Sequence, residues 1–342
     1  MRLPLPWLLT LTTAALALLL VGSLATGPMS LSLGESLRAL FAGQQSGIEA
    51  HKLLIVQEIR LPRTLLCIAV GAILGLCGAV MQGLFRNPLA DPGIIGVSGG
   101  AALGAALAIV LLAPLSQQWQ SLLGLGLLPL LAFLGGALTT TLVYLLGTRE
   151  GGTSVTVMLL AGVAITALSG AVIGLLTYLA DDQMLRNLSL WQMGSLAAGK
   201  PLDVALALAT LAALLWLFMR DANPLNALLL GEGEARHLGV NVQALKRRLI
   251  LLTAAGVGVA VAVAGMIGFV GLVVPHLVRL LAGPNHVRLL PLSALLGAGL
   301  LLGADMLART LLAPAELPVG IITALMGAPF FIWLLVKSRR TL

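Results

Sequence analysis

The chain has 342 residues and a formal net charge of +7, and 59% of its residues are hydrophobic while only 10% are charged. Soluble domains carry about 25% charged residues, so this composition excludes an ordinary soluble domain and predicts that lipid surrounds most of the chain. The positive charge does not indicate nucleic-acid binding. Its basic residues lie at the ends of apolar segments, where they favour contact with lipid headgroups.

Long stretches of the chain contain no Asp, Glu, Lys or Arg. They are residues 3–34, 64–85, 92–148, 151–180, 204–219, 249–278, 289–304 and 317–336. A membrane-spanning helix needs about 20 apolar residues, so residues 92–148 hold two spans, divided at the polar segment PLSQQWQ (residues 114–120). No segment alternates apolar and polar residues as a barrel strand does. The fold class is therefore an all-α polytopic membrane protein, with a single transmembrane domain over residues 1–342.

In chain order, the spans are expected at about 7–26, 61–83, 93–112, 123–147, 153–179, 202–220, 246–264, 268–282, 288–308 and 318–337. The count is nine or ten, because the break GMIGFVGLVVP (residues 265–275) fits either two short helices or one interrupted helix. Arg2 and the apolar run after it also fit a cleavable signal peptide, but we expect an uncleaved first span, since the rest of the chain is membrane-embedded.

Basic residues set the orientation, because they are retained in the cytoplasm during insertion. With these spans and a cytoplasmic N-terminus, the cytoplasmic side holds Arg2, Arg86, Arg149, Arg220, Arg236, Lys246, Arg247, Arg248, Arg279, Arg288, Lys337, Arg339 and Arg340. The outer side holds Arg38, Lys52, Arg60, Arg63, Arg186, Lys200 and Arg309. Both termini are therefore expected in the cytoplasm.

The sequence offers little for an energy source of its own. Asp305 is the charge placed well inside a span, and Arg309 follows it at the i, i+4 spacing of an ion pair. A proton-coupled transporter usually needs ionisable groups in the membrane, so that reading is disfavoured. GSLAAGKP (residues 194–201) has the spacing of a phosphate loop, but Pro201 replaces the Ser or Thr that would hold Mg²⁺. The chain is therefore not expected to be an enzyme.

Glycines at four-residue spacing let membrane helices approach closely. The pairs expected to pack within the bundle are Gly71/Gly75, Gly96/Gly100/Gly104, Gly170/Gly174 and Gly299/Gly303. The scattered histidines His51, His237, His276 and His286 are not expected to bind haem or metal.

The largest cytoplasmic segment, residues 221–248, is where an energy-supplying partner would bind. Its core, NALLLGEGEARHLGV (residues 226–240), fits short amphipathic helices outside the bilayer, with Glu232 and Arg236 paired at i, i+4. Ala235 and Gly239 would leave a small, flat surface for another protein. A solvated loop helix is the alternative interpretation.

Several longer motifs resemble the iron-siderophore, haem and cobalamin permeases, which are the membrane subunits of type II ABC importers. These motifs are RLPR (60–63), QGLFRNPLADP (82–92), GVSGG (96–100), GMIGFVGLVVP (265–275), ADMLAR (304–309) and ELPVG (316–320). The resemblance runs from about residue 55 to the C-terminus. It implies ten helices per subunit and a homodimer with a central translocation path. It also implies two cytoplasmic ATPase subunits, which bind ATP and Mg²⁺, and a periplasmic substrate-binding protein. No cofactor or metal is implied on this chain itself.

The resemblance also assigns roles to individual residues. Arg60, Arg63 and Arg309 match outer-side arginines that receive acidic side chains of the binding protein. The residues that match the ATPase-coupling segment of the family are Gly231, Glu232, Glu234, Ala235, Arg236, Leu238 and Gly239. Asn87 and Leu89 match the cytoplasmic gate, whose other half is Ser154 or Thr156. The segments DDQMLR (181–186) and LWQMGS (190–195) look most like haem permeases, with ferric siderophore and cobalamin as the other cargoes.

Overall fold

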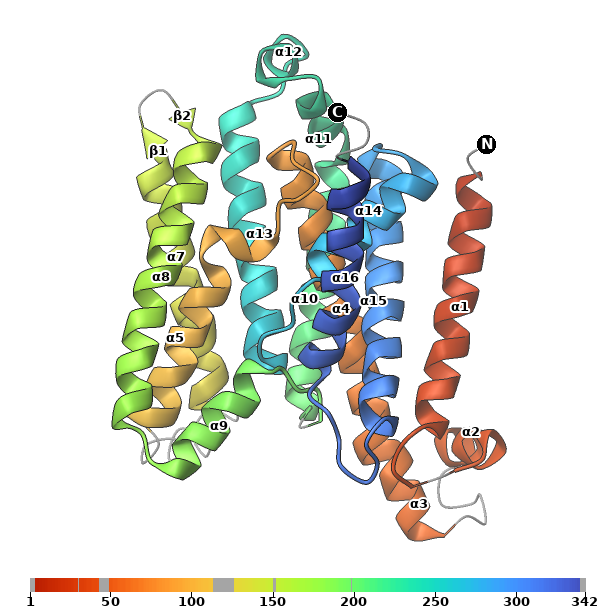
Figure 1. Ribbon diagram of the computed structural model, residues 1–342. Coiled ribbons are helices and arrows are strands. Elements are labelled where there is room, and N and C mark those ends of the chain that lie inside the picture. Colours follow the sequence, from red (N-terminus) through yellow and green to blue (C-terminus); the bar gives the residue numbers. More distant parts are fainter. Residues whose placement is uncertain are drawn as a thin grey trace.

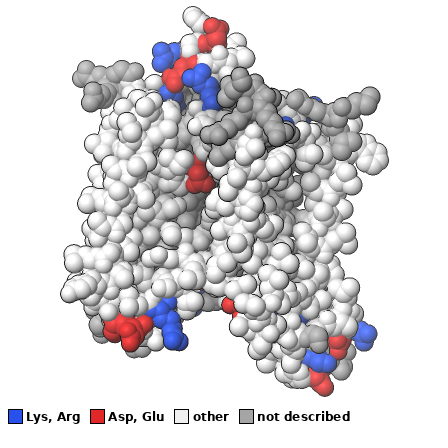
Figure 2. Space-filling view, in the orientation of Figure 1, with Lys and Arg blue, Asp and Glu red and all other residues white. Residues whose placement is uncertain are grey.

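The computed structural model describes residues 4–29, 31–42, 49–112, 126–149, 152–197 and 199–338. Its helices run between two ends of the molecule (Figure 1). One end, the α12 end, carries the start of α1, the end of α16 and the short helices α11 and α12. The opposite α9 end carries α2, α3 and α9. Charged side chains gather at these two ends, and the belt between them is almost wholly uncharged, apart from an acidic group set back in its upper part (Figure 2).

Among the described residues, seven helical stretches are long and apolar enough to cross a membrane. They are α1 (Leu5–Ala25), Ala50–Leu84, α7 (Leu127–Gly147), α8 (Val155–Leu179), α10 (Pro201–Arg220), α13 (Val242–Ala264) and α15 (His286–Thr310). Shorter apolar helices are α5 (Val97–Val110), α14 (Val270–Ala282) and α16 (Val319–Ser338). Each predicted span coincides with one of these helices, so the predicted all-α membrane fold is confirmed. Residues 114–120, the predicted polar break, lie outside the described residues.

Short elements connect the long helices. Ala50–Leu84 is continuous and consists of α3 (Ala50–Leu54), the π-helical turn η2 (Ile55–Arg60) and α4 (Leu61–Leu84). The others are α2 (Leu33–Ala42), the 3₁₀ turn η3 (Pro92–Ile95), α9 (Asp182–Gln192), α11 (Ala222–Leu229) and α12 (Glu232–His237). Two strands of two residues, β1 (Thr148–Arg149) and β2 (Gly152–Thr153), pair antiparallel before α8.

The ambiguous region 249–282 forms two helices. α13 ends at Ala264 and α14 begins at Val270. Between them, Gly265 has φ 69° and Phe269 has φ 67°, left-handed values that stop a helix. The break therefore reverses the chain direction, so that α14 returns toward the α12 end (Figure 1).

α4 is the central helix of the bundle. Buried residues make up 89% of its apolar window, against 17% for those of α1 and α8. A helix that is apolar on every side is typical of such a buried position. Its glycines make close approach possible. A Cβ on Gly71 would lie 2.4 Å from the Gly297 carbonyl oxygen, and one on Gly78 would lie 1.9 Å from that of Gly271. α15 and α14 therefore contact the α4 backbone directly.

Two of the predicted glycine sets are confirmed and two are wrong. Gly71/Gly75 pack against α15, and Gly100 and Gly104 pack against the backbone of α7 at Gly135 and Leu131. In contrast, a Cβ on Gly170, Gly174 or Gly303 would meet no atom within 4 Å, and one on Gly299 would make only an ordinary contact with Leu19. Four-residue spacing of glycines does not by itself predict packing, because it does not show which face of a helix another helix covers.

Gly297→Ala is expected to lower the free energy of unfolding by about 1–3 kcal/mol, the usual cost of overpacking. Its Cβ would lie 2.3 Å from the Gly71 carbonyl oxygen, so α4 and α15 must separate. Gly303→Ala, on the same helix but facing open space, is the matched control and should leave stability unchanged. Thermal unfolding in detergent compares the two. Equal melting temperatures would contradict the close contact of α4 with α15.

Candidate functional site

A buried group of charges, which we call the charge cluster, joins α4 to α15 near the α9 end. It consists of Arg63, Asp305, Arg309 and Glu316. Arg63 donates from Nη2 to Asp305 Oδ1 at 2.8 Å and from Nη1 to Glu316 Oε2 at 2.7 Å. Arg309 Nη2 lies 2.9 Å from Asp305 Oδ2. The Asp305 side chain is fully buried, so this carboxylate is held between two guanidinium groups.

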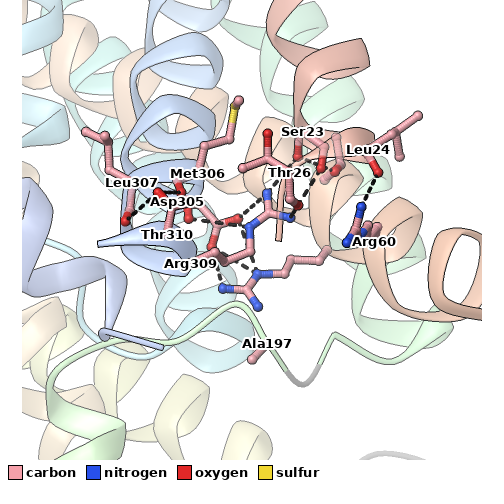
Figure 3. A network of polar contacts seen from close by, with 12 residues as sticks. Ser23, Leu24, Thr26, Arg60, Ala197, Asp305, Met306, Leu307, Arg309 and Thr310 are labelled. Atoms are coloured by element: carbon pink, nitrogen blue, oxygen red, sulfur yellow. Dashed lines mark hydrogen bonds and ion pairs between the residues drawn. The ribbon is translucent and has the colours of Figure 1, made fainter. Parts of the chain in front are cut away.

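The charge cluster also holds the end of α1. Arg309 donates to Ser23 Oγ at 2.7 Å and to the carbonyl oxygen of Thr26 at 3.2 Å. Figure 3 shows Arg309 between Asp305 and this helix end, with Arg60 turned separately toward Leu24. Arg60 Nη1 donates to the carbonyl oxygens of Leu24 and Ala25, each at 2.8 Å. The carbonyls that a helix end leaves unpaired are thus satisfied by two arginines.

These contacts give the three predicted docking arginines a role that the sequence did not predict. Arg60, Arg63 and Arg309 lie near the α9 end, away from α12, as predicted, but only 4%, 6% and 2% of their surfaces are exposed. Their guanidinium groups point into the protein, because Asp305, Glu316 and the end of α1 supply acceptors. A partner's carboxylate reaches them only after displacing those acceptors. The predicted i, i+4 pair of Asp305 with Arg309 is confirmed.

A second ion pair ties α2 to α3 at the α9 end. Glu35 accepts a hydrogen bond from the Ser32 backbone N–H at 2.9 Å, and Lys52 Nζ lies 3.0 Å from its other oxygen. The hydrogen bond from the Ser32 backbone, together with Lys52, lowers the pKa of Glu35 to about 2. Glu35 is therefore ionised at neutral pH, and the pair is present there.

A partly open cavity of about 410 Å³ lies where the interrupted segments of the chain meet. Its wall includes Asp91 before η3, Ser98 at the start of α5, Met193 after α9, and Phe269 before α14. The Asp91 carboxylate accepts the Gly93 N–H at 2.7 Å and so begins η3. A cavity of this size, mainly apolar with a few polar groups, is typical of a small-molecule path or site.

Backbone contacts join the three loops that line this cavity. The Ser195 N–H donates to the Ala264 carbonyl at 2.8 Å, and the Gly320 N–H donates to that of Met193 at 3.1 Å. A Cβ on Gly320 would lie 2.2 Å from the same Met193 oxygen, and one on Gly265 would lie 2.4 Å from the Trp191 oxygen. The motifs at residues 190–195, 265–275 and 316–320 are therefore neighbours in space.

The predicted coupling segment projects from the α12 end (Figure 1). α11 and α12 form the two short helices that the sequence predicts, and Glu234, Arg236, Leu238 and Gly239 are exposed. Leu230 and Leu238 have 67% and 64% of their surfaces exposed, which leaves apolar area for a partner. The predicted open surface at Ala235 is wrong, because Ala235 lies on the buried face of α12.

Polar contacts anchor this segment to the spans. Asn226 Oδ1 accepts the His286 backbone N–H at 2.8 Å, which ties α11 to α15. Asp221 Oδ2 accepts from Arg248 Nε at 2.7 Å. The predicted Glu232–Arg236 pair is confirmed at 3.9 Å, but Glu232 makes a shorter contact, 2.5 Å, with Lys246 of α13.

Lys246 is a residue that the sequence assigned only to membrane orientation. It lies beside Arg247 and Arg248, and three adjacent basic residues look alike at the start of an apolar helix. In the structure Arg247 is exposed, whereas only 2% of the Lys246 surface is exposed. The sequence signal that distinguishes Lys246 is its position three and four residues before Leu249 and Ile250, which places it on the same buried face of the helix.

The predicted gate residues lie in two segments. Asn87 Oδ1 accepts the Leu89 N–H at 2.9 Å in the turn after α4, and Ser154 caps α8 by accepting the Val157 N–H at 3.5 Å. Thr156 and Leu89 are exposed. The segment after Leu89 packs on α8, since a Cβ on Gly162 would lie 2.0 Å from the Ile94 carbonyl oxygen. The structure thus brings the two segments together, although a gating role stays a prediction.

A helical bundle with charge at two ends, a partly open cavity lined by interrupted helices and a projecting short helix are typical of a multi-pass membrane transport protein. Residues 15–337 match the FecCD transport family, and the chain belongs to that family. It is therefore the permease subunit of an ABC transporter, not itself an enzyme, and no cofactor is expected on it.

Similar proteins cover almost the whole chain. A hemin transport system permease protein, HmuU of Yersinia pestis, is 47% identical and covers 95% of this chain and 93% of its own length. A vitamin B12 import system permease protein, BtuC of Klebsiella pneumoniae, is 42% identical and covers 97% and 94%. A solved structure of a metal-chelate type ABC transporter in an inward-facing conformation superposes with a TM-score of 0.84 at 36% identity, covering 97% and 99%.

Proposed function

We propose that the chain is the permease of a binding-protein-dependent importer that moves haem across the bacterial inner membrane. The observation that carries this proposal is the 47% identity to a hemin permease over 95% of the chain. Cobalamin permeases at 42–46% identity make cobalamin the second candidate cargo, and a ferric siderophore is the third.

The proposed assembly is a homodimer with ten spans per subunit, two ATPase subunits and a periplasmic binding protein. The seven long and three shorter apolar helices of the described residues support ten spans. In such a dimer the 410 Å³ cavity would form part of the path between subunits. Asn87, Leu89 and either Ser154 or Thr156 would form its cytoplasmic gate.

The α12 end is assigned to the cytoplasm, with both termini and the ATPase-coupling residues Gly231, Glu232, Glu234, Ala235, Arg236, Leu238 and Gly239. The excess of basic residues at this end supports that orientation. The binding protein would then dock on the α9 end. Arg60, Arg63 and Arg309 would contribute to docking in one of two ways. They stabilise the surface that the binding protein contacts, or they bind its carboxylates themselves once the charge cluster has opened.

A proton-driven secondary transporter is the alternative from another class. Its required carboxylate would be Asp305, yet both oxygens of Asp305 are paired with arginines at 2.8 and 2.9 Å. Both oxygens of this buried carboxylate are thus occupied by structural ion pairs within the protein. The ion pairs therefore favour an importer whose energy comes from a partner.

Uptake into proteoliposomes tests the proposal. The vesicles contain the chain with its ATPase, and the binding protein outside is loaded with haem, a ferric siderophore or cobalamin in parallel. We expect accumulation of haem only when ATP is present inside. ATP-dependent accumulation of cobalamin or of the siderophore would identify that molecule, instead of haem, as the cargo. Uptake that ignores ATP or follows a proton gradient would overturn the importer.

A further inference from the structure

Lys246 makes two polar contacts inside the protein at the α12 end. Its Nζ donates to Glu232 Oε1 at 2.5 Å and to the Thr153 carbonyl oxygen at 3.0 Å. Only 2% of its side chain is exposed. A buried ammonium group is tolerated only when it is paired and hydrogen-bonded, so both contacts are needed to keep Lys246 in place.

The two acceptors belong to elements far apart in the chain. Glu232 is the first residue of α12, in the projecting coupling segment. Thr153 ends β2 and directly precedes Ser154, the residue that caps the N-terminus of α8. Figure 1 shows the start of α13 between the β1–β2 hairpin and α12. Lys246 therefore connects the coupling segment to the start of α8 through one ammonium group.

Gln243, one helical turn before Lys246 on α13, also binds strand β2. Its Oε1 accepts the Thr153 N–H at 3.1 Å, while Lys246 donates to the Thr153 carbonyl. Both main-chain polar groups of Thr153 are thus bonded to α13. The hairpin cannot move relative to α13 without breaking these bonds, so it follows that helix.

α12 is built so that it can shift as a unit. Gly231 before it has φ 124° and Gly239 after it has φ 82°, conformations that glycine adopts without strain. Hinges are commonly a few residues at element ends that absorb such changes. Between these glycines, Glu232 carries the side-chain contact with α13.

We propose that Lys246 is a positioning residue that transmits the displacement of α12 to the N-terminus of α8, where the gate is assigned. The inference rests on the proposed coupling role of α12. Movement of Glu232 carries the buried ammonium group with it, because Lys246 cannot give up its counter-ion at low cost. The Thr153 carbonyl then follows, and with it the cap of α8.

The test measures both movement and transport in the assembled transporter. Spin labels are attached at Arg236→Cys on α12 and, separately, at Thr156→Cys on α8. Both positions are exposed, and the native Cys67 and Cys77 are buried. In the otherwise unchanged protein, ATP should alter the mobility of both labels. In Lys246→Met, which keeps the length of the side chain but not its charge, only the α12 label should respond.

Cargo transported per ATP hydrolysed should fall by about 5- to 150-fold in Lys246→Met, the usual range of coupling between sites. Lys246→Arg should restore part of it, and Arg247→Met, at the exposed neighbour, should not change it. Glu232→Gln should reduce the ratio, and adding it to Lys246→Met should cause little further loss, since both break one connection. A merely structural role would lower the amount of folded protein without changing this ratio.

The outcomes separate the two proposals. If ATP leaves the α12 label unchanged in the protein with native Lys246, the coupling role of α12 is wrong. If the α12 label responds and the Thr156 label responds equally in Lys246→Met, the coupling role stands and the inference about Lys246 is wrong. Should Lys246→Met fail to fold, Glu232→Gln gives the same comparison, because Glu232 is partly exposed.

Discussion

Asp305→Asn is expected to lower the free energy of unfolding by about 3–5 kcal/mol, the cost of leaving a buried charge without its partner. Asparagine has nearly the shape of aspartate but no charge. Arg63 and Arg309, of which 6% and 2% are exposed, would then face each other without the carboxylate between them. Unfolding in mixed micelles, followed by circular dichroism, measures the loss.

Asp182→Asn is the matched control for this variant. Asp182 is exposed in the first turn of α9, at the same end of the molecule, and it should unfold like the unchanged protein. An Asp305→Asn variant of normal stability would contradict the charge cluster as a structural element. If that stable variant also lost a proton-driven flux, the secondary transporter would be supported.

Glu234→Lys is expected to weaken binding of the ATPase by tenfold or more, because like charges brought together at an interface cost several kcal/mol. Glu234 is exposed on α12, and within the described part of the chain it forms no ion pair. The substitution should therefore leave the melting temperature of the isolated permease unchanged. Co-purification of the ATPase and ATP-dependent uptake measure the effect.

Asp182→Lys makes the same charge reversal at the α9 end and is the control for Glu234→Lys. It should retain ATPase binding. Normal assembly and transport by Glu234→Lys would show that α12 does not contact the ATPase, which would contradict the proposed coupling role of α12.

The helices were predictable because charge-free length alone indicates a span. Composition alone left the division of residues 249–282 open, and the family resemblance predicted α13 and α14 by implying ten helices. The positive φ of Phe269 at this break has no signal in the sequence. Glycine spacing predicted the contacts of Gly71 and Gly75 but failed at Gly170 and Gly174. Which helix face is covered depends on packing between distant segments, and local spacing does not contain that information.

The candidate site was predicted in part. The Asp305–Arg309 pair follows from four-residue spacing within a helix. The contact of Arg63 with Asp305 joins residues 242 positions apart, and the sequence provides no local signal for it. The same holds for Lys246 and Thr153, which are 93 positions apart. Arginines expected to face a partner are consequently buried, and a lysine expected only to orient a helix connects α12 to the segment that precedes α8.

The arginines at the end of α1 have a consequence for biosynthesis. Ser23 is translated 286 residues before Arg309, which hydrogen-bonds to it. At about 5–20 residues per second, synthesis of the intervening chain takes roughly 15–60 s. During that interval α1 resides in the membrane, and of the two arginines only Arg60 is present to hydrogen-bond the carbonyl groups at its end. The first helix made is thus among the last to be locked in place, so premature termination before α15 would leave a loosely held α1 for membrane proteases to recognise.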